Sequence, residues 1–365
     1  MNMNGLLPEG FHDRLPPHAD AAAALARRVL DVARLYGYEQ VDPPLAEFEE
    51  SLGARLKAGS AKDAVRFTDP VSRRTLAIRP DITAQVGRIA ATRMAHHPRP
   101  VRLSYAGQVL KLRASQLRPE RAMQQVGCEL IGRDSVAAVR EIVTVAVEAL
   151  EAAGVPSLAL DFTLPDLVEQ LAPDMAATQL AALRERLDAK DAAGVAAIDP
   201  AFLPLIEAAG PFEAAIARLR AHDSAGVLAS RLDGLEEVAQ AVAGRVSLTL
   251  DPTERHGFEY QSWIGFSLFA RGVRGEIGRG GSYSVIGAAG DEPAVGFSLF
   301  ADPILDAQLA PAERRRLFVP YGTDADAAAL LRAAGWVAVA ALDPEDSAAA
   351  QLCTHELRDG MPVEL

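Results

Sequence analysis

The sequence has few of the residues that build disulfide frameworks, metal centres or membrane spans. Its two cysteines, Cys128 and Cys353, are too few for a disulfide framework and do not form a metal-binding pattern. No apolar run approaches the about 20 residues that a membrane-spanning helix requires. The N-terminal stretch MNMNGLLPEGFHDRLPP lacks a basic segment followed by an apolar core, so we expect no signal peptide. These absences predict a reduced, cytoplasmic protein that holds no metal or other cofactor and has no membrane partner.

Positive charge is also scarce. The 365 residues include 37 Lys and Arg against 49 Asp and Glu, which gives a formal net charge of −12. Loose nucleic-acid binding depends on neutralising phosphates with basic side chains, so this charge opposes it. The glycine-rich dinucleotide-binding motif, the P-loop and the GxSxG nucleophile motif are missing from the sequence. Nothing in the sequence therefore supports the common nucleotide-binding or serine-hydrolase classes.

The pattern of apolar residues predicts an α+β fold. Leu25, Val29, Val32 and Tyr36 recur at helical spacing, and Gly37 is expected to end that helix. Most other segments alternate apolar and polar residues between glycine or proline turns, as β-hairpins do. Because the strands come in hairpins with helices grouped around them, we expect an antiparallel sheet and not an alternating parallel one. The expected strands lie in YEQVDPPLAEF, AVRFTDPVSRRTLAIR, RPVRLSYAGQVLKLR, AMQQVGCELIG, SLALDFT, RVSLTL, FEYQSWIGFSLFARGVRGEIGRGGSYSVIG and PAVGFSLF.

Three further stretches complete the expected fold. Ser135 is expected to cap a helix that ends at Gly154. Residues 165–243 are rich in alanine and read as helices with Pro and Gly breaks and no chemical motif. From about residue 316 the pattern gives one helix between two short strands.

Five segments in order resemble the catalytic core of class II aminoacyl-tRNA synthetases, and histidyl-tRNA synthetase most of all. GYEQVDPPLAEFEESL is similar to motif 1, LSYAGQVLKLRASQLRPERAMQQVGCELIG to motif 2, and GGSYSVIGAAGDEPAVGFSLFADPIL to motif 3. LAIRPDIT looks like the amino-acid-binding loop, and RHGFEYQSWIGF like a degraded histidine-specific motif. The resemblance implies a class II synthetase-like antiparallel sheet flanked by helices. It also implies the division into a core, residues 1–164 and 244–310, a helical insertion, 165–243, and a small C-terminal α/β domain, 316–365.

The chain departs from this resemblance where the synthetases hold ATP. Their motif 2 has an Arg for the α-phosphate and a Glu near the adenine, and here Lys111 and Arg113 stand in those places. Motif 3 ends in an Arg for the γ-phosphate, and here the residue is Pro303. The Arg of the histidine motif aligns with His256, beside Arg255. Lys does not replace Arg at a bidentate phosphate site. Losing two or three such contacts would cost about 3–9 kcal/mol, or roughly two to six decades in rate. We therefore expect a degenerate ATP site and no catalysis.

The amino-acid side of the implied pocket is better preserved. A site for free histidine needs a carboxylate for the ammonium group and polar partners for both ring nitrogens. The alternative is that these residues are inherited and now only structural. The second aromatic of the histidine motif is Gln261 here. By the resemblance, the histidine-binding candidates are Asp81, Thr83 and Gln125 for the ammonium, Glu129 and Tyr283 for the ring, and Arg255 and Tyr260 from the histidine motif.

A synthetase core without these arginines, and with a C-terminal piece too short to read an anticodon, resembles the regulatory subunits of ATP phosphoribosyltransferase. LLPEGFHDRLP, RPDITAQVGRIA and RGEIGRGGSY are the local spellings that carry this resemblance. It implies a non-catalytic partner of the short-form catalytic subunit in histidine biosynthesis. It also implies a homodimer within a hetero-octamer, L-histidine as feedback effector, and no tRNA. Two alternatives remain: a degenerate histidyl-tRNA synthetase, and a free-standing amino-acid sensor that regulates another protein, since a shared fold does not decide function.

Overall fold

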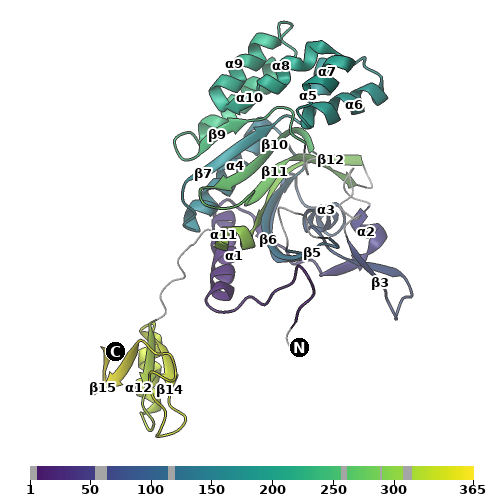
Figure 1. Ribbon diagram of the computed structural model, residues 1–365. Coiled ribbons are helices and arrows are strands. Elements are labelled where there is room, and N and C mark those ends of the chain that lie inside the picture. Colours follow the sequence, from purple (N-terminus) through teal and green to yellow (C-terminus); the bar gives the residue numbers. More distant parts are fainter. Residues whose placement is uncertain (1–5, 54–63, 114–119, 256–260, 288–289, 307–314) are drawn as a thin grey trace. The chain divides into compact units, whose positions relative to one another are not determined.

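The computed structural model describes residues 6–53, 64–113, 120–255, 261–287, 290–306 and 315–365. The chain divides into two compact units, Met1–Leu309 and Ala310–Leu365 (Figure 1). The larger unit contains the segments that resemble a synthetase core, so the functional site is sought there.

A large sheet organises the first unit. Among the described residues it has nine strands in the order β1-β5-β6-β12-β11-β10-β7-β9-β8. The hairpin pairs β5–β6, β10–β11 and β11–β12 are antiparallel, which confirms the predicted α+β fold class. The bounds are β1 Glu39–Gln40, β5 Val101–Leu110, β6 Ala122–Ile131, β7 Leu158–Thr163, β8 Gly210–Pro211, β9 Ser247–Leu250, β10 Gln261–Ala270, β11 Gly278–Gly287 and β12 Gly290–Phe300.

Two strand pairs depart from the predicted antiparallel arrangement. β1 pairs with β5, and β7 pairs with β9, in parallel. A parallel pair needs a long crossover to return the chain to the same end of the sheet. The helices between β7 and β9 provide one such crossover, and the segment between β1 and β5 provides the other.

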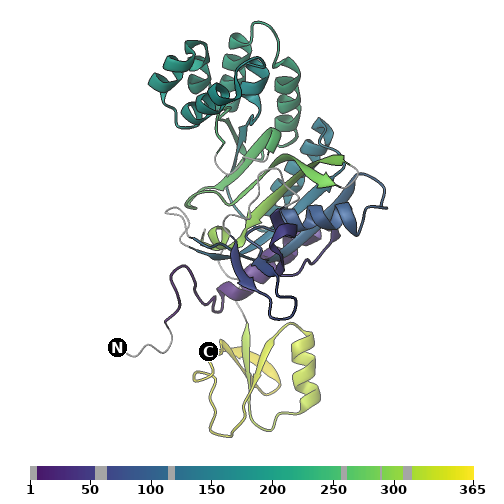
Figure 2. The ribbon, with the colours of Figure 1, turned by 90° about the vertical axis from the view of Figure 1, so that its right-hand side faces the viewer.

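Helices cover both faces of this sheet (Figures 1 and 2). On one face, α1, His18–Leu35, α4, Val136–Ala152, and α11, Ala301–Asp306, pack on the central strands. α3, Thr83–Thr92, packs on the other face against β6 and β11. As predicted, α1 ends before Gly37, which has a φ of +83°. Ser135 stands at the N-cap of α4 as expected, but its side chain makes no capping hydrogen bond.

The face that carries α3 is also bordered by a small sheet. Its described strands are β2, Ala46–Phe48, β3, Val65–Thr68, and β4, Thr75–Ile78, in the order β2-β4-β3. The short helix α2, Glu49–Gly53, follows β2. The chain leaves β4 directly before the loop that enters α3, so this sheet fixes the start of the candidate amino-acid-binding loop.

The alanine-rich stretch is helical, as predicted. Its helices are α5 Leu167–Leu171, α6 Ala177–Asp188, α7 Ala192–Ile198, α8 Leu203–Glu207, α9 Phe212–His222 and α10 Ala229–Ala241, with a 3-10 turn at Pro200–Phe202. Lys190, between α6 and α7, connects this group to the core through its Nζ, 2.5 Å from Asp251 Oδ1 and 2.6 Å from Thr253 Oγ1. The helices therefore attach to the segment that leads from β9 toward β10.

The second unit is a small α/β structure with its own core. β13, Arg316–Val319, α12, Ala325–Ala333, and β14, Val337–Ala340, follow the predicted strand–helix–strand. The prediction of only two strands was wrong, because β15, His355–Arg358, and β16, Met361–Glu364, complete a sheet in the order β14-β13-β15-β16. Leu317, Val319, Ala328 and Leu357 form its buried cluster.

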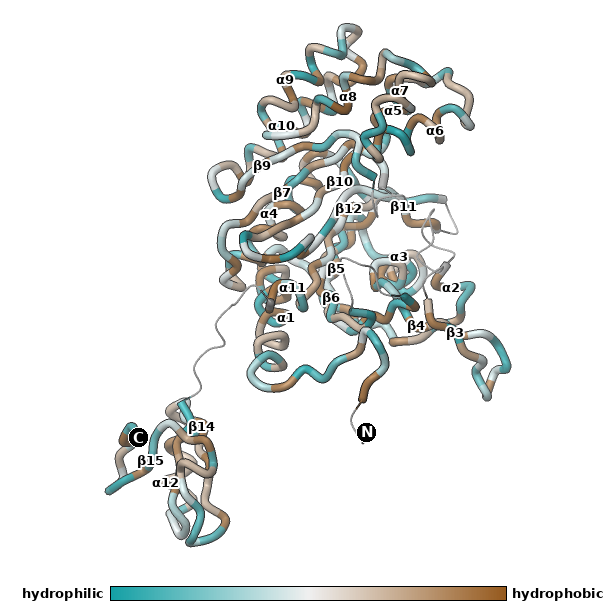
Figure 3. Tube along the Cα trace, in the orientation of Figure 1, coloured by the Kyte–Doolittle hydropathy of each residue, from teal (hydrophilic) through white to brown (hydrophobic). Residues whose placement is uncertain are grey.

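Hydrophobic residues recur along the central strands and along α4 (Figure 3). α4 buries Val139, Val143, Ala146 and Leu150, which recur at helical spacing along one face. Within the described ranges, none of the helices has both the length and the apolar character required to cross a membrane.

Candidate functional site

The candidate site lies over a row of glycines that runs across neighbouring strands of the large sheet. Gly296 on β12, Gly281 on β11 and Gly265 on β10 are direct neighbours across the three strands. Glu129 on β6 stands opposite Gly296, at one end of this row. Residues directly opposite each other in a sheet point to the same face. The glycines therefore form a floor, with the Glu129 side chain at its edge.

Glu129 is a buried carboxyl group held by two tyrosines. Tyr105 donates its hydroxyl hydrogen to Oε1 over 3.1 Å, and Tyr283 donates to Oε2 over 2.7 Å. Burial raises the pKa of Glu129 to about 8, although the hydrogen bond from Tyr283 lowers it. The carboxyl group therefore carries a proton through most of the neutral range. In that state it can both donate and accept a hydrogen bond, as recognition of an imidazole ring requires.

A second polar group lies next to Glu129. The Asp81 carboxylate accepts the backbone N–H of Thr83 over 2.7 Å and the side-chain amide of Gln125 over 2.9 Å. The same Gln125 nitrogen also donates to Ser298 Oγ over 2.7 Å, and Ser298 lies 2.9 Å from the Tyr105 hydroxyl. The structure therefore joins Asp81, Thr83 and Gln125 to Glu129 in one continuous hydrogen-bonded network.

Gln125 also fixes the loop before α3. Its Oε1 accepts the backbone N–H of buried Ile82 over 3.0 Å. Gln125 itself is fully buried, so its amide is oriented by partners on three sides. This explains why Asp81 and Thr83 are held next to the sheet although they belong to a loop and a helix end.

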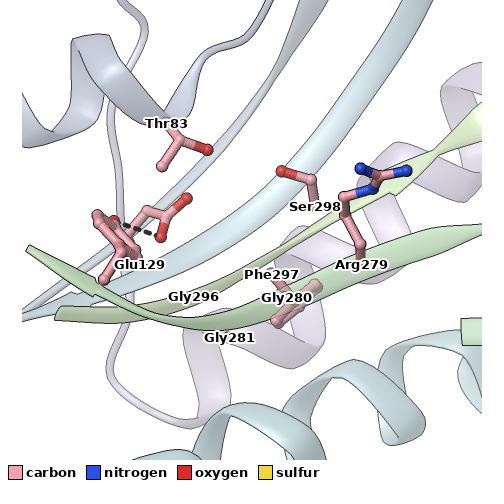
Figure 4. A pocket seen from close by; sticks show the side chains of 9 residues that line it. Thr83, Glu129, Arg279, Gly280, Gly281, Gly296, Phe297 and Ser298 are labelled. Carbon is pink, nitrogen blue, oxygen red and sulfur yellow. Dashed lines mark hydrogen bonds between the residues drawn. The ribbon is translucent and has the colours of Figure 1, made fainter. Parts of the chain in front are cut away.

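Arg279 borders the same hollow and was missed by the sequence analysis. It lies on β11 and, with Ser298, stands at one end of the hollow, while Thr83 and Glu129 stand at the other (Figure 4). Its guanidinium forms a paired contact with Glu276, Nε to Oε1 at 2.6 Å and Nη2 to Oε2 at 2.7 Å. Tyr105 and Ser298 were missed as well. The signal for all three was their place in the strand alternation, which becomes informative only when the register is known.

The hollow between these groups is small. Its volume is about 10 Å³, which is about the space that one buried water molecule needs. An amino acid is larger than this, so its entry requires the lining side chains to move. The polar groups around the hollow are suited to a small ligand that carries both signs of charge.

The histidine-binding candidates from the histidine motif are not part of this described network. The backbone N–H of Arg255 donates to Asp188 Oδ1 over 2.8 Å, at the end of α6. Burial, and then the nearby charge of Arg255, lower the pKa of Arg184 to about 10. Arg255 therefore lies against the helical insertion and is not among the described residues that line the hollow. Tyr260 and His256 fall outside the described residues.

The positions to which the resemblance assigns ATP follow β5, at Lys111 and Arg113, and lie within α11, at Pro303. Lys111 is half-buried, and its backbone N–H donates to the Arg121 carbonyl over 2.8 Å. Arg113 is exposed, and Pro303 is half-buried within α11. The described lining of the hollow at Glu129 includes none of these three. Within the described ranges, no group of His, Cys, Asp and Glu residues could hold a metal ion.

Comparison with known proteins adds to this geometry. The family model for histidyl-tRNA synthetase matches residues 10–304. Relatives named ATP phosphoribosyltransferase regulatory subunit include one from Paramagnetospirillum magneticum, 43% identical over 99% of this chain and 98% of its own length. One from Rhodospirillum centenum is 44% identical over 93% of this chain and 90% of its own length.

Solved structures show the same fold. A protein from Bacillus halodurans, titled an ATP phosphoribosyltransferase regulatory subunit/histidyl-tRNA synthetase, superposes with a TM-score of 0.80 at 21% identity, over 96% of each chain. Histidyl-tRNA synthetase from Nostoc gives 0.79 at 16% identity, over 98% of this chain and 92% of its own. These similarities confirm the predicted class II synthetase-like fold.

Proposed function

Since this chain belongs to the family of ATP phosphoribosyltransferase regulatory subunits, which share the fold of histidyl-tRNA synthetase, we propose that it activates a short-form catalytic subunit and transmits feedback inhibition by L-histidine. The regulatory role places it in histidine biosynthesis. The catalytic subunit, working in the cytoplasm, joins ATP to phosphoribosyl pyrophosphate, and this chain supplies the control that such a subunit lacks.

In this proposal the chain has no catalysis of its own. Lys111, Arg113 and Pro303 take the places of the groups that hold ATP in a synthetase, and Lys cannot provide the planar, two-pronged contact of Arg. The resemblance further suggests homodimers within a hetero-octamer. The C-terminal unit is a small sheet with one described helix, and we propose that the protein does not bind tRNA.

The observation that carries the proposal is the polar network around Glu129. An amino-acid ammonium group fits beside Asp81, Thr83 and Gln125, because a buried cation needs a carboxylate and hydrogen-bond acceptors. The imidazole ring would lie beside Glu129 and Tyr283, which are hydrogen-bonded to each other, once the lining side chains have moved. Asp81 remains half-buried next to fully buried Gln125, so ligand binding there would stabilise one arrangement of the loop before α3.

Regulation follows if that arrangement differs from the one that activates the partner. A ligand shifts a conformational equilibrium only by its difference in affinity for the two states. The small volume of the hollow supports such a difference, because an amino acid must displace side chains in order to enter. Linkage is reciprocal, so substrates of the catalytic subunit should weaken histidine binding by the same factor by which histidine weakens theirs, typically about 5–150-fold.

The test is a titration of purified catalytic subunit with this chain, with and without histidine. We expect phosphoribosyl transfer to rise to a plateau as the chain is added, and to fall again with histidine. Asp81→Ala should preserve the activation and remove the inhibition, because it changes the ligand site and leaves the partner surface intact. Unchanged activity across the titration, together with no complex on gel filtration, would refute the proposal and favour a free-standing sensor.

A further inference from the structure

Arg279 is placed to recognise the part of an amino acid that the polar network does not serve. On β11 it stands directly opposite Ser298 of β12, two residues along the strands from the pair Gly281 and Gly296. Its side chain therefore rises on the same face as the glycine floor. Ser298 lies between Arg279 and the Gln125 amide, to which it is hydrogen-bonded.

Groups of different character lie at the two ends of the hollow. The buried carboxyl group of Glu129 lies at one end, and the Arg279 guanidinium lies at the other. The Asp81 carboxylate is not among the described lining residues and joins the network through Gln125. Among the described lining residues, Arg279 is the one with a positively charged side chain. A free amino acid is a zwitterion, and its α-carboxylate needs a cation or several donors when it leaves water.

The contact with Glu276 orients Arg279 for this role. Glu276 is held on one edge of the guanidinium through Nε and Nη2, which fixes the plane of the group. The Arg279 side chain is 25% exposed and that of Glu276 is 13% exposed, so the pair is partly shielded from solvent. A planar, fixed guanidinium is well suited to bind a carboxylate.

We propose that Arg279 binds the α-carboxylate of the amino acid held at the Glu129 hollow, an inference that rests on the histidine site proposed above. By the resemblance, His256 stands at the motif arginine that serves the carboxylate, with Arg255 beside it. His256 lies outside the described residues, and the backbone N–H of Arg255 donates to Asp188, against the helical insertion. A phosphate would satisfy the same guanidinium. We favour a carboxylate, because the neighbouring groups, Asp81, Gln125 and Glu129, suit an ammonium and a ring.

The test compares L-histidine with histamine, which keeps the ammonium and the imidazole but lacks the carboxylate. Calorimetry on the full chain should show that the native protein prefers histidine. Arg279→Gln should weaken the binding of histidine about 10- to 100-fold and leave the affinity for histamine unchanged. The preference for histidine over histamine should therefore disappear. Arg279→Lys should restore part of it, because the charge returns without the planar geometry. Inorganic phosphate serves as a second probe of the oxyanion site. If phosphate competes with histidine in the native protein and not in Arg279→Gln, the result supports the assignment of Arg279 to this site.

Two further variants make the result specific. Arg274→Gln removes an exposed arginine from the turn of the same hairpin and should change neither affinity. Arg255→Gln tests the competing assignment. If Arg255→Gln removes the preference and Arg279→Gln preserves it, the inference is overturned.

The remaining outcomes separate this inference from the proposed function. If the native protein binds histidine and histamine equally well, the histidine site stands and the role of Arg279 is refuted. If it binds neither at millimolar concentration, both are refuted. A parallel thermal melt identifies variants that fail to fold, and histamine binding by Arg279→Gln shows directly that its pocket is intact.

Discussion

The Glu129 carboxyl group lies directly over the backbone of Gly296 on the neighbouring strand. A Cβ atom added at Gly296 would overlap Glu129 Oε2 and approach the Cys128 carbonyl oxygen to 2.7 Å. The glycine is therefore what allows the carboxyl group to lie flat on the sheet, between the tyrosines that hold it.

Gly296→Ala should reduce both stability and histidine binding. Overpacking of this kind costs about 1–3 kcal/mol, measured as a lower free energy of unfolding in urea. In a Glu129→Ala background the same substitution should cost less by at least about 0.5 kcal/mol, because the overlapping side chain is gone. Equal costs in the two backgrounds would contradict the close approach of Glu129 to Gly296.

Glu129 should make stability depend on pH. Burial raises its pKa from 4.5 to about 8, so between these values the folded state holds a proton that the unfolded state releases. The contribution to the free energy of unfolding is then full below about pH 4.5 and falls as the pH rises to 8, by about 5 kcal/mol at most. Glu129→Gln should flatten this part of the stability–pH profile. Parallel profiles for the two proteins would show that the group titrates normally.

Asp81→Ala should weaken histidine binding most among the ammonium-side variants. It removes the carboxylate for the ammonium and leaves Gln125 without one of its partners. We expect about a 10- to 100-fold loss of affinity by calorimetry. Asp174→Ala removes an exposed carboxylate from the segment between α5 and α6 and should have no effect. Equal losses in both variants would indicate a general electrostatic effect instead of a direct contact.

The protein should not activate histidine. By the resemblance, Lys111, Pro303 and His256 stand where a synthetase has arginines. If two or three of these contacts are lost, histidine-dependent ATP–pyrophosphate exchange should fall by roughly two to six decades relative to a synthetase. A histidyl-tRNA synthetase assayed in parallel provides the reference. Exchange within tenfold of that enzyme would mean that the ATP site is functional.

The two compact units should unfold separately. Leu317 belongs to the small core of the second unit, whereas Phe297 belongs to the large core of the first. Leu317→Ala should cost about 2–5 kcal/mol in one calorimetric transition only, and Phe297→Ala should lower the other. A single transition that shifts with both substitutions would show that the units unfold together.

Local patterns in the sequence were sufficient to predict most of the helices and strands. Helical spacing and Gly37 predicted α1. The segment expected to form β10 and β11 contains Gly272 and Gly275, and both have positive φ in the turn between these strands. The parallel pairs β1–β5 and β7–β9 could not be predicted, because such pairing depends on where long crossovers return the chain. β15 and β16 were missed, although Asp359 and Gly360 both have positive φ and an Asp-Gly pair is a hairpin signal.

The candidate site, too, could be predicted from the sequence only in part. Family resemblance located Asp81, Gln125 and Glu129, which the structure brings into one network. Arg279 carried no signal of its own, because one arginine in a glycine-rich strand reads as a solvated residue. Only the register that sets it opposite Ser298 indicates its place beside the hollow.

The alternation along β11 has a consequence for refolding. Gly280 faces the opposite side of the sheet from Arg279, and a Cβ there would collide with the Phe266 ring. A slip of one residue would turn Arg279 to the face on which Phe266 is buried and would take its guanidinium away from the hollow. Chains that mispair β11 should therefore lose ligand and native packing together. The recovery of histidine affinity after dilution from denaturant should then report the yield of correctly paired sheets.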